Sequence, residues 1–97
     1  MIMSTYIVRN VHDGKRPGNW IEYWENATGI KAGKCHRIDC LTDHSEATDG
    51  AHVQLVGSKD QRWYIVPLCH KCNCQYGEIF TVRGPLVAAT DSRVILP

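Results

Sequence analysis

The chain has 97 residues, which is enough for one domain over residues 1–97 but not for two. Its five cysteines are an odd number, so a fully paired set of disulfides within the chain is excluded. The formal net charge of +1 is low for a dedicated nucleic-acid binder. No run approaches the length of about 18 apolar residues that would span a membrane, and residues 1–9 lack the pattern of a signal peptide. Together these features predict a cytoplasmic protein with reduced thiols.

The first part of the chain predicts one strand and one helix. Thr5–Val11 is rich in β-branched and aromatic residues and predicts a strand, and residues 12–18 contain the Asp-Gly and Pro-Gly pairs of a turn. Asn19 is a favoured N-cap, and the apolar residues after it recur at helical spacing. We therefore expect an N-terminal amphipathic helix over Trp20–Thr28 that ends at Gly29. Its aromatic side chains are expected to pack in the core rather than to stack on nucleic-acid bases.

The second part of the chain predicts a β-hairpin. Residues 30–50 are polar and indicate a loop. Two short apolar segments, Ala51–Val56 and Trp63–Leu68, flank a polar turn and predict the two strands of the hairpin. A short helix is expected near Asn73–Ile79. The last segment, residues 83–97, fits either a covering strand or a frayed end.

Four of the five cysteines form two closely spaced pairs. Cys35 and Cys40 enclose four residues, and Cys69 and Cys72 enclose two. Zinc prefers four sulfur or nitrogen ligands in a tetrahedron, and two tight turns can each supply one pair. The first pair precedes the predicted hairpin and the second follows it and opens a helix, which is the order of a treble clef. The sequence thus predicts one structural Zn²⁺ held by these four cysteines.

Other assignments stay open at this point. His36 or His44 could replace one cysteine of the first pair, since Cys40 and His44 also have a ligand spacing. A redox CxxC would need a βαβ context that this short chain does not supply, and buried inert thiols are a third interpretation. Cys74 is expected to be a small buried residue, with a ligand role as the alternative.

Two segments around the second cysteine pair follow a familiar order. Gly50–Val53 (GAHV) is followed by a loop and then by Tyr64–Asn73 (YIVPLCHKCN). This arrangement resembles the zinc-containing HNH family, in which a cysteine pair precedes an Asp-His-Ile-type strand and an Asn-Leu-Val-Pro-Leu-Cys-x-x-Cys-His/Asn segment. The resemblance covers residues 35–76 and implies an HNH-like core over residues 35–80. HNH enzymes cleave nucleic-acid phosphodiesters, with a histidine as general base on water and a divalent ion at the scissile phosphate.

The resemblance implies catalytic roles for two residues. His52 matches the general base, and Asn73 matches the last His/Asn, which is a ligand of the catalytic metal. The position before the base is usually acidic but is Ala51 here, and the asparagine that orients the base falls at Tyr64. A hard cation prefers carboxylate oxygens, so Asn73 alone would hold it poorly.

These departures favour binding over catalysis. We expect an α+β, zinc-binding HNH-like module that is not an enzyme and that binds nucleic acid or another protein, without an organic cofactor or a membrane. The alternative is a divergent HNH endonuclease of phage or mobile-element type. It would use His52 as base and a second divalent ion such as Mg²⁺, with Asp49 or Asp60 as the missing carboxylate. As a structural residue, His52 would instead pack against the zinc-binding turns and donate a hydrogen bond to a backbone carbonyl.

Overall fold

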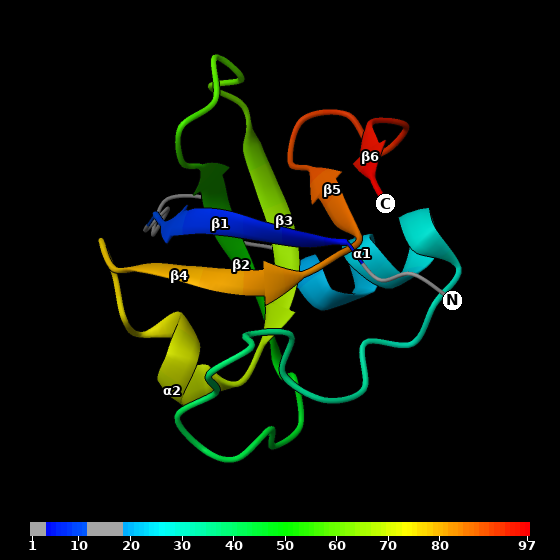
Figure 1. The fold of residues 1–97 in the computed structure, drawn as a ribbon. Helices are drawn as coiled ribbons and strands as arrows, with labels where there is room; N and C mark the ends of the chain where they lie inside the picture. The colour runs from blue at the N-terminus through cyan, green and yellow to red at the C-terminus, as the bar shows by residue number, and fades with distance from the viewer. Residues whose placement is uncertain (1–3, 12–18) are drawn as a thin grey trace.

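Six antiparallel strands form one sheet in a computed structural model that describes residues 4–11 and 19–97. The strand order is β4-β1-β2-β3-β5-β6 (Figure 1). The strands are β1 (Thr5–Asn10), β2 (Asp49–Leu55), β3 (Trp63–Leu68), β4 (Ile79–Arg83), β5 (Leu86–Ala88) and β6 (Ile95–Leu96). The two helices of the described residues are α1 (Trp20–Thr28) and α2 (His70–Asn73). The fold class is α+β, as predicted, and the turn predicted for residues 12–18 lies outside the described residues.

The predicted hairpin forms the middle of the sheet. β2 and β3 pair with Val53 opposite Tyr64 and with Asp49 opposite Leu68. Because side chains alternate along a strand, Ala51 and Val53 point to one side of β2 and His52 points to the other. Because of this register, Ala51 and His52 lie on opposite faces of the sheet and contact different residues.

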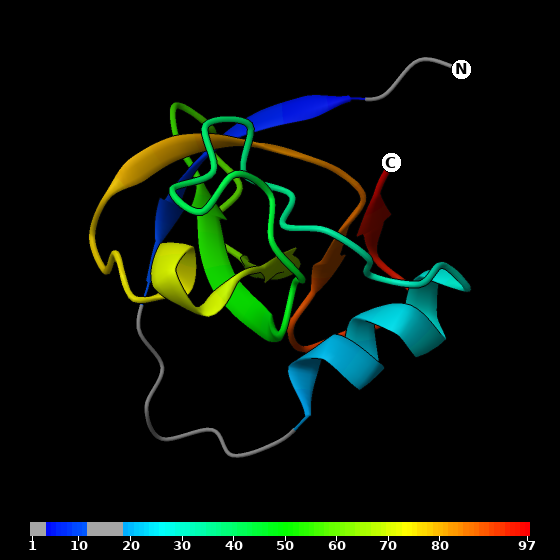
Figure 2. The ribbon, with the colours of Figure 1, turned by 90° about the horizontal axis from the view of Figure 1, so that it is seen from below.

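The buried side chains form two clusters. The larger one contains three cysteines together with Val8, Ala51, Val53, Tyr64, Val66, Leu68, Phe80, Val82, Leu86 and Ala88. The smaller one is centred on Trp24 and packs α1 against β2, β3 and β5 (Figure 2). Ala51 belongs to the larger cluster, whereas His52, its neighbour in sequence, contacts Trp20 and Trp63, which pack against the smaller one.

Local signals fix both ends of α1, which has the bounds predicted for it. The side chain of Asn19 accepts a hydrogen bond from the backbone N–H of Glu22 at 3.1 Å, as an N-cap does. Gly29 ends the helix with a φ of 71°, a left-handed conformation that glycine adopts without strain. Trp24 is fully buried, which confirms the prediction that this aromatic side chain packs in the core.

Two predictions for the second part of the chain are wrong. No helix forms over Asn73–Ile79; α2 ends at Asn73, and Ile79–Arg83 forms strand β4. Gly77, with a φ of 79°, turns the chain away from the helix and back toward β1. Cys74 is exposed rather than buried, because it follows the single turn of α2 at the surface of the protein.

The last segment forms strands instead of fraying. β5 is buried along its whole length and pairs with both β3 and β6. In the part of the chain that the structure describes, neither helix is long and apolar enough to cross a membrane.

The loop of residues 30–48 lies with α2 at one end of the sheet (Figures 1 and 2). Part of it follows the outer edge of β4. The N–H of Ile38 donates to the carbonyl of Thr81, and the N–H of Arg83 donates to the carbonyl of His36, both at 2.9 Å. These bonds hold the first cysteine-containing turn against the sheet.

Candidate metal centre

Four cysteine sulfurs converge where the loop meets α2. The ligand atoms of Cys35, Cys40, Cys69 and Cys72 all lie within 4.8 Å of one another. The Sγ of Cys40 lies 3.8 Å from the Sγ of Cys69 and 3.8 Å from the Sγ of Cys72. Four sulfurs at the Zn–S distance of about 2.3 Å in a tetrahedron would be about 3.8 Å apart. The separations therefore fit a tetrahedral metal–thiolate site, which we call the four-cysteine centre.

Two backbone segments place the four sulfurs: the start of α2 holds Cys69 and Cys72, and the loop holds Cys35 and Cys40. Cys69 follows β3 directly and is the N-cap of α2, and Cys72 lies inside that helix. Cys35 is fixed in the loop, where its N–H donates to the carbonyl of Ser45 at 2.9 Å. Cys40 completes the first turn. The centre thus joins the loop to the end of the central hairpin.

Hydrogen-bond donors surround the sulfurs. The hydroxyl of Thr42 donates to the Sγ of Cys69 at 3.2 Å, and the backbone N–H of Leu41 lies 3.4 Å from the Sγ of Cys72. The N–H of Thr42 lies 3.5 Å from the Sγ of Cys40. Donors around a metal ligand fix its orientation and stabilise negative charge on it.

The surroundings act differently on the individual thiols. Burial raises the pKa of Cys40, but hydrogen bonds from Thr42 and from the backbone of His44 outweigh it and lower that pKa to about 6. Burial raises the pKa of Cys35 above its usual value. A thiolate buried at Cys35 therefore requires a nearby positive charge, which a bound cation at the four-cysteine centre would supply.

The two candidate histidine ligands lie apart from the sulfurs. The ring nitrogens of His36 lie 3.2 Å from the carbonyl oxygens of Arg83 and Ala32, which hold the ring away from the centre. His44 is exposed and does not belong to the group of converging ligand atoms. Among the described residues, the cysteine-only set is the one that the structure brings together.

His52 lies beside the smaller buried cluster and does not belong to the group of converging sulfur ligands. It is only 7% exposed. The centroid of its ring is 4.7 Å from that of Trp20 and 6.1 Å from that of Trp63, with both pairs close to perpendicular. The packing partners expected for a structural His52 were the zinc-binding turns, but the observed partners are aromatic. A general base on an exposed face of the hairpin would require α1 to move.

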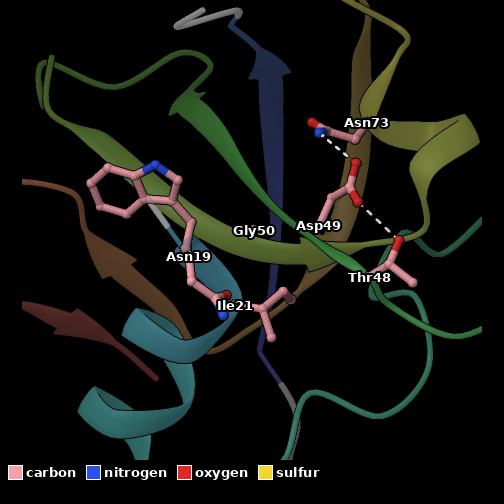
Figure 3. A pocket seen from close by; sticks show the side chains of 7 residues that line it. Asn19, Ile21, Thr48, Asp49, Gly50 and Asn73 are labelled. Carbon is pink, nitrogen blue, oxygen red and sulfur yellow. Dashed lines mark hydrogen bonds between the residues drawn. The ribbon is translucent and has the colours of Figure 1, made fainter. Parts of the chain in front are cut away.

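Asp49 and Asn73 meet in a groove of about 540 Å³ at the start of β2 (Figure 3). The amide Nδ2 of Asn73 donates to Oδ2 of Asp49 at 3.0 Å, and the hydroxyl of Thr48 donates to Oδ1 at 2.9 Å. Burial raises the pKa of Asp49, but hydrogen bonds from Asn73 and His70 outweigh it and lower that pKa below its usual value. Asp49 is thus the carboxylate that lies beside Asn73.

The other candidate carboxylate, Asp60, contacts Tyr64 and Arg62 instead of Asn73. Asp60 accepts a hydrogen bond from the hydroxyl of Tyr64 at 2.5 Å and pairs with the guanidinium of Arg62 at 3.0 Å. The hydroxyl of Tyr64 is therefore directed to Asp60, so it does not take over the orienting role of the HNH asparagine at His52.

Sequence reasoning missed the contacts of His70. Its ring is hydrogen-bonded to both Asp49 and Cys74. The spacing of His70 and Cys74 is visible in the sequence, but the approach of Asp49 depends on the pairing of β2 with β3. No sequence signal gives that register.

No family model, curated protein or solved structure matches the chain. The fold and the site therefore define the protein as a small α+β protein with a four-cysteine cluster that could bind a metal ion.

Proposed function

We propose that the chain is a structural zinc-binding module of the HNH-like, treble-clef type that binds a macromolecule and does not catalyse a reaction. The observation that carries the proposal is the four-cysteine centre, whose 3.8 Å sulfur separations fit tetrahedral zinc. The chain order supports the treble clef, because one cysteine pair precedes the β2–β3 hairpin and the other opens α2. The helix α1, with Trp24 buried and Glu22 and Asn26 exposed, would serve as the amphipathic helix that covers the hairpin.

Three positions support a non-catalytic role. Ala51 stands where the HNH family carries an acidic ligand, and it is 1% exposed within the larger buried cluster. His52 packs against Trp20. Tyr64, at the position of the orienting asparagine, is fully buried and bonds to Asp60. The hairpin thus uses the catalytic positions of the family for packing.

Charge favours a protein over nucleic acid as the partner. Four thiolates against one Zn²⁺ change the formal net charge by two units, from +1 to −1. Binding to nucleic acid relies on Lys and Arg neutralising phosphates, and a metal-loaded chain with no excess of positive charge gains little from it. A gel-shift series with DNA and RNA at low and high salt tests this point. A salt-sensitive shift at micromolar protein would identify nucleic acid as the partner instead.

Metal analysis tests the zinc-binding role. Native mass spectrometry of the purified chain should show one tightly held zinc, which Cys40→Ser removes. Cys74→Ser is the matched control, because it changes a cysteine outside the four-cysteine centre and should leave this zinc in place. A folded chain that carries no zinc, or one that keeps its zinc after Cys40→Ser, would overturn the proposal.

The contact of Asp49 with Asn73 favours endonuclease activity as a second candidate function. Plasmid nicking with Mg²⁺, Mn²⁺ or Ni²⁺ tests it, with His52→Ala as the variant and His44→Ala as the matched control. Cleavage that is lost in His52→Ala and kept in His44→Ala would refute the non-catalytic role. Absence of nicking with all three metals would refute the endonuclease.

A further inference from the structure

A second pair of metal-binding side chains lies on the outer side of α2. The Sγ of Cys74 is 3.4 Å from Nε2 of His70, and both residues are exposed. A sulfur and a nitrogen that bind one tetrahedral zinc at about 2.3 Å and about 2.0–2.1 Å would be about 3.5 Å apart. The two atoms therefore already have the separation of ligands on a shared ion.

The helix sets this separation. His70 is the first residue of α2, and Cys74 is its C-cap, still in the right-handed helical conformation with a φ of −77°. The N–H of Cys74 donates to the carbonyl of His70 at 3.0 Å and closes the turn. Side chains four residues apart lie on the same face of a helix, and paired metal ligands use this spacing.

The ring of His70 is oriented as in a metal-binding histidine. Its Nδ1 lies 2.8 Å from Oδ2 of Asp49, and Asp49 is itself held by hydrogen bonds from Asn73 and Thr48. A carboxylate on one ring nitrogen fixes the tautomer and leaves the other nitrogen free to bind a metal. Here that other nitrogen is the one that faces Cys74.

The surface beside the pair leaves room for further ligands. A groove of about 730 Å³ is lined by both residues together with Thr42, Glu46, Thr48, Cys69, Lys71 and Gln75. Two side chains fill two positions of a tetrahedron, and an open zinc site completes its coordination with water or an incoming ligand. Cys69 belongs to the four-cysteine centre, so that centre forms one wall of this groove.

From these contacts we propose that His70 and Cys74 form a second metal site, for a borderline-soft divalent cation such as Zn²⁺, with Asp49 as the residue that positions His70. The site differs from the four-cysteine centre in having two protein ligands and open positions. Its thiolate and imidazole donors favour Zn²⁺ or Co²⁺ over Mg²⁺.

The test is a Co²⁺ titration of the full chain whose four-cysteine centre already holds one zinc. One further equivalent should bind, with the absorption of a single sulfur-to-cobalt charge transfer. Cys74→Ala should abolish that absorption, and His70→Ala should weaken binding at least tenfold. Asp49→Asn should weaken it by about 10–100-fold, as expected for a residue that orients a ligand. His44→Ala changes an exposed histidine that does not line this groove and should change nothing.

Three results would overturn this site. They are no further equivalent of Co²⁺ at millimolar concentration, an equivalent that binds equally well to Cys74→Ala, and one that is lost equally in His44→Ala. Native mass spectrometry before the titration counts the first zinc separately, and far-ultraviolet circular dichroism checks the fold of each variant. Failure of the four-cysteine centre would appear as a missing first zinc, so it is distinguishable from failure of this site.

Discussion

Removal of the metal from the four-cysteine centre should cost the protein much of its stability. Three of the four cysteines belong to the larger buried cluster. Residues 30–48 contain no helix and no strand of the sheet, so the metal takes the place of regular structure in this part of the protein. Without the metal, this loop would be held by isolated hydrogen bonds, such as that from the N–H of His36 to the carbonyl of Pro67 at 3.0 Å, and by the packing of Ala32 and Ala47 in the smaller buried cluster.

The expected loss can be worked out from binding linkage. A ligand that binds only the folded chain stabilises it by about 4 kcal/mol when its free concentration is about 1,000 times its Kd. Structural zinc sites in small domains bind with about 10–16 kcal/mol. A binding free energy of about 12 kcal/mol corresponds to a Kd of about 1 nM, so micromolar zinc reaches that ratio from about the middle of this range upward. The total stability of a domain is about 5–15 kcal/mol. A loss of about 4 kcal/mol corresponds to a fall in Tm of roughly 15–30 °C for a domain of this size.

Thermal unfolding followed by far-ultraviolet circular dichroism measures this effect, with the protein in excess zinc and in a strong chelator. Cys72→Ser should melt near the chelated native protein in both conditions. Cys74→Ala lies outside the four-cysteine centre and should keep the full difference between them. The reasoning is refuted if native protein, shown by elemental analysis to be zinc-free, melts at the same temperature as the zinc-loaded protein.

Three further predictions concern the packing around the site. Trp24→Phe should lower the free energy of unfolding by about 2–3 kcal/mol in urea, because the buried indole N–H donates to a backbone carbonyl at 2.9 Å and the smaller ring leaves that carbonyl unpaired. Gly50→Ala should cost about 1–3 kcal/mol in thermal unfolding, since a Cβ would lie 2.5 Å from the backbone carbon of Trp20. Burial, followed by the hydrogen bond to Asp60 and the negative charge of that residue, raises the pKa of Tyr64 to about 12. The usual value in an unfolded chain is about 10, so the stabilisation is complete below pH 10 and is lost as the pH rises from about 10 to 12. Tyr64→Phe should remove that part of the alkaline loss, as measured by urea unfolding across this range; an unchanged alkaline profile would contradict the assignment.

The hairpin and the cysteine pairs could be predicted because their signals are local. Trp63–Leu68 is a short apolar run beside a polar turn, and its predicted bounds are those of β3. The spacing of Cys69 and Cys72 is visible within four residues of sequence. Their approach to Cys35 and Cys40 was inferred from zinc chemistry, and the structure confirms that the four sulfurs converge.

The long-range contacts could not be predicted in the same way. β1 pairs with β4 through contacts such as Val8 opposite Phe80, and no local pattern links residues so far apart in the chain. The helix expected over Asn73–Ile79 does not form because the chain turns at Gly77 and Ile79 then begins β4, whose pairing with β1 is one of these long-range contacts. The burial of His52 likewise depends on where α1 packs. The local sequence around His52 does not determine that position.

The first cysteine-containing turn also covers one edge of the sheet. β4 is the outermost strand on its side, and Arg37 forms an antiparallel bridge with Val82 along that edge. An uncovered strand edge offers free N–H and C=O groups to other chains and promotes aggregation. Loss of the metal would loosen this cover, so we expect removal of zinc to promote aggregation through β4 as well as to lower the stability of the fold.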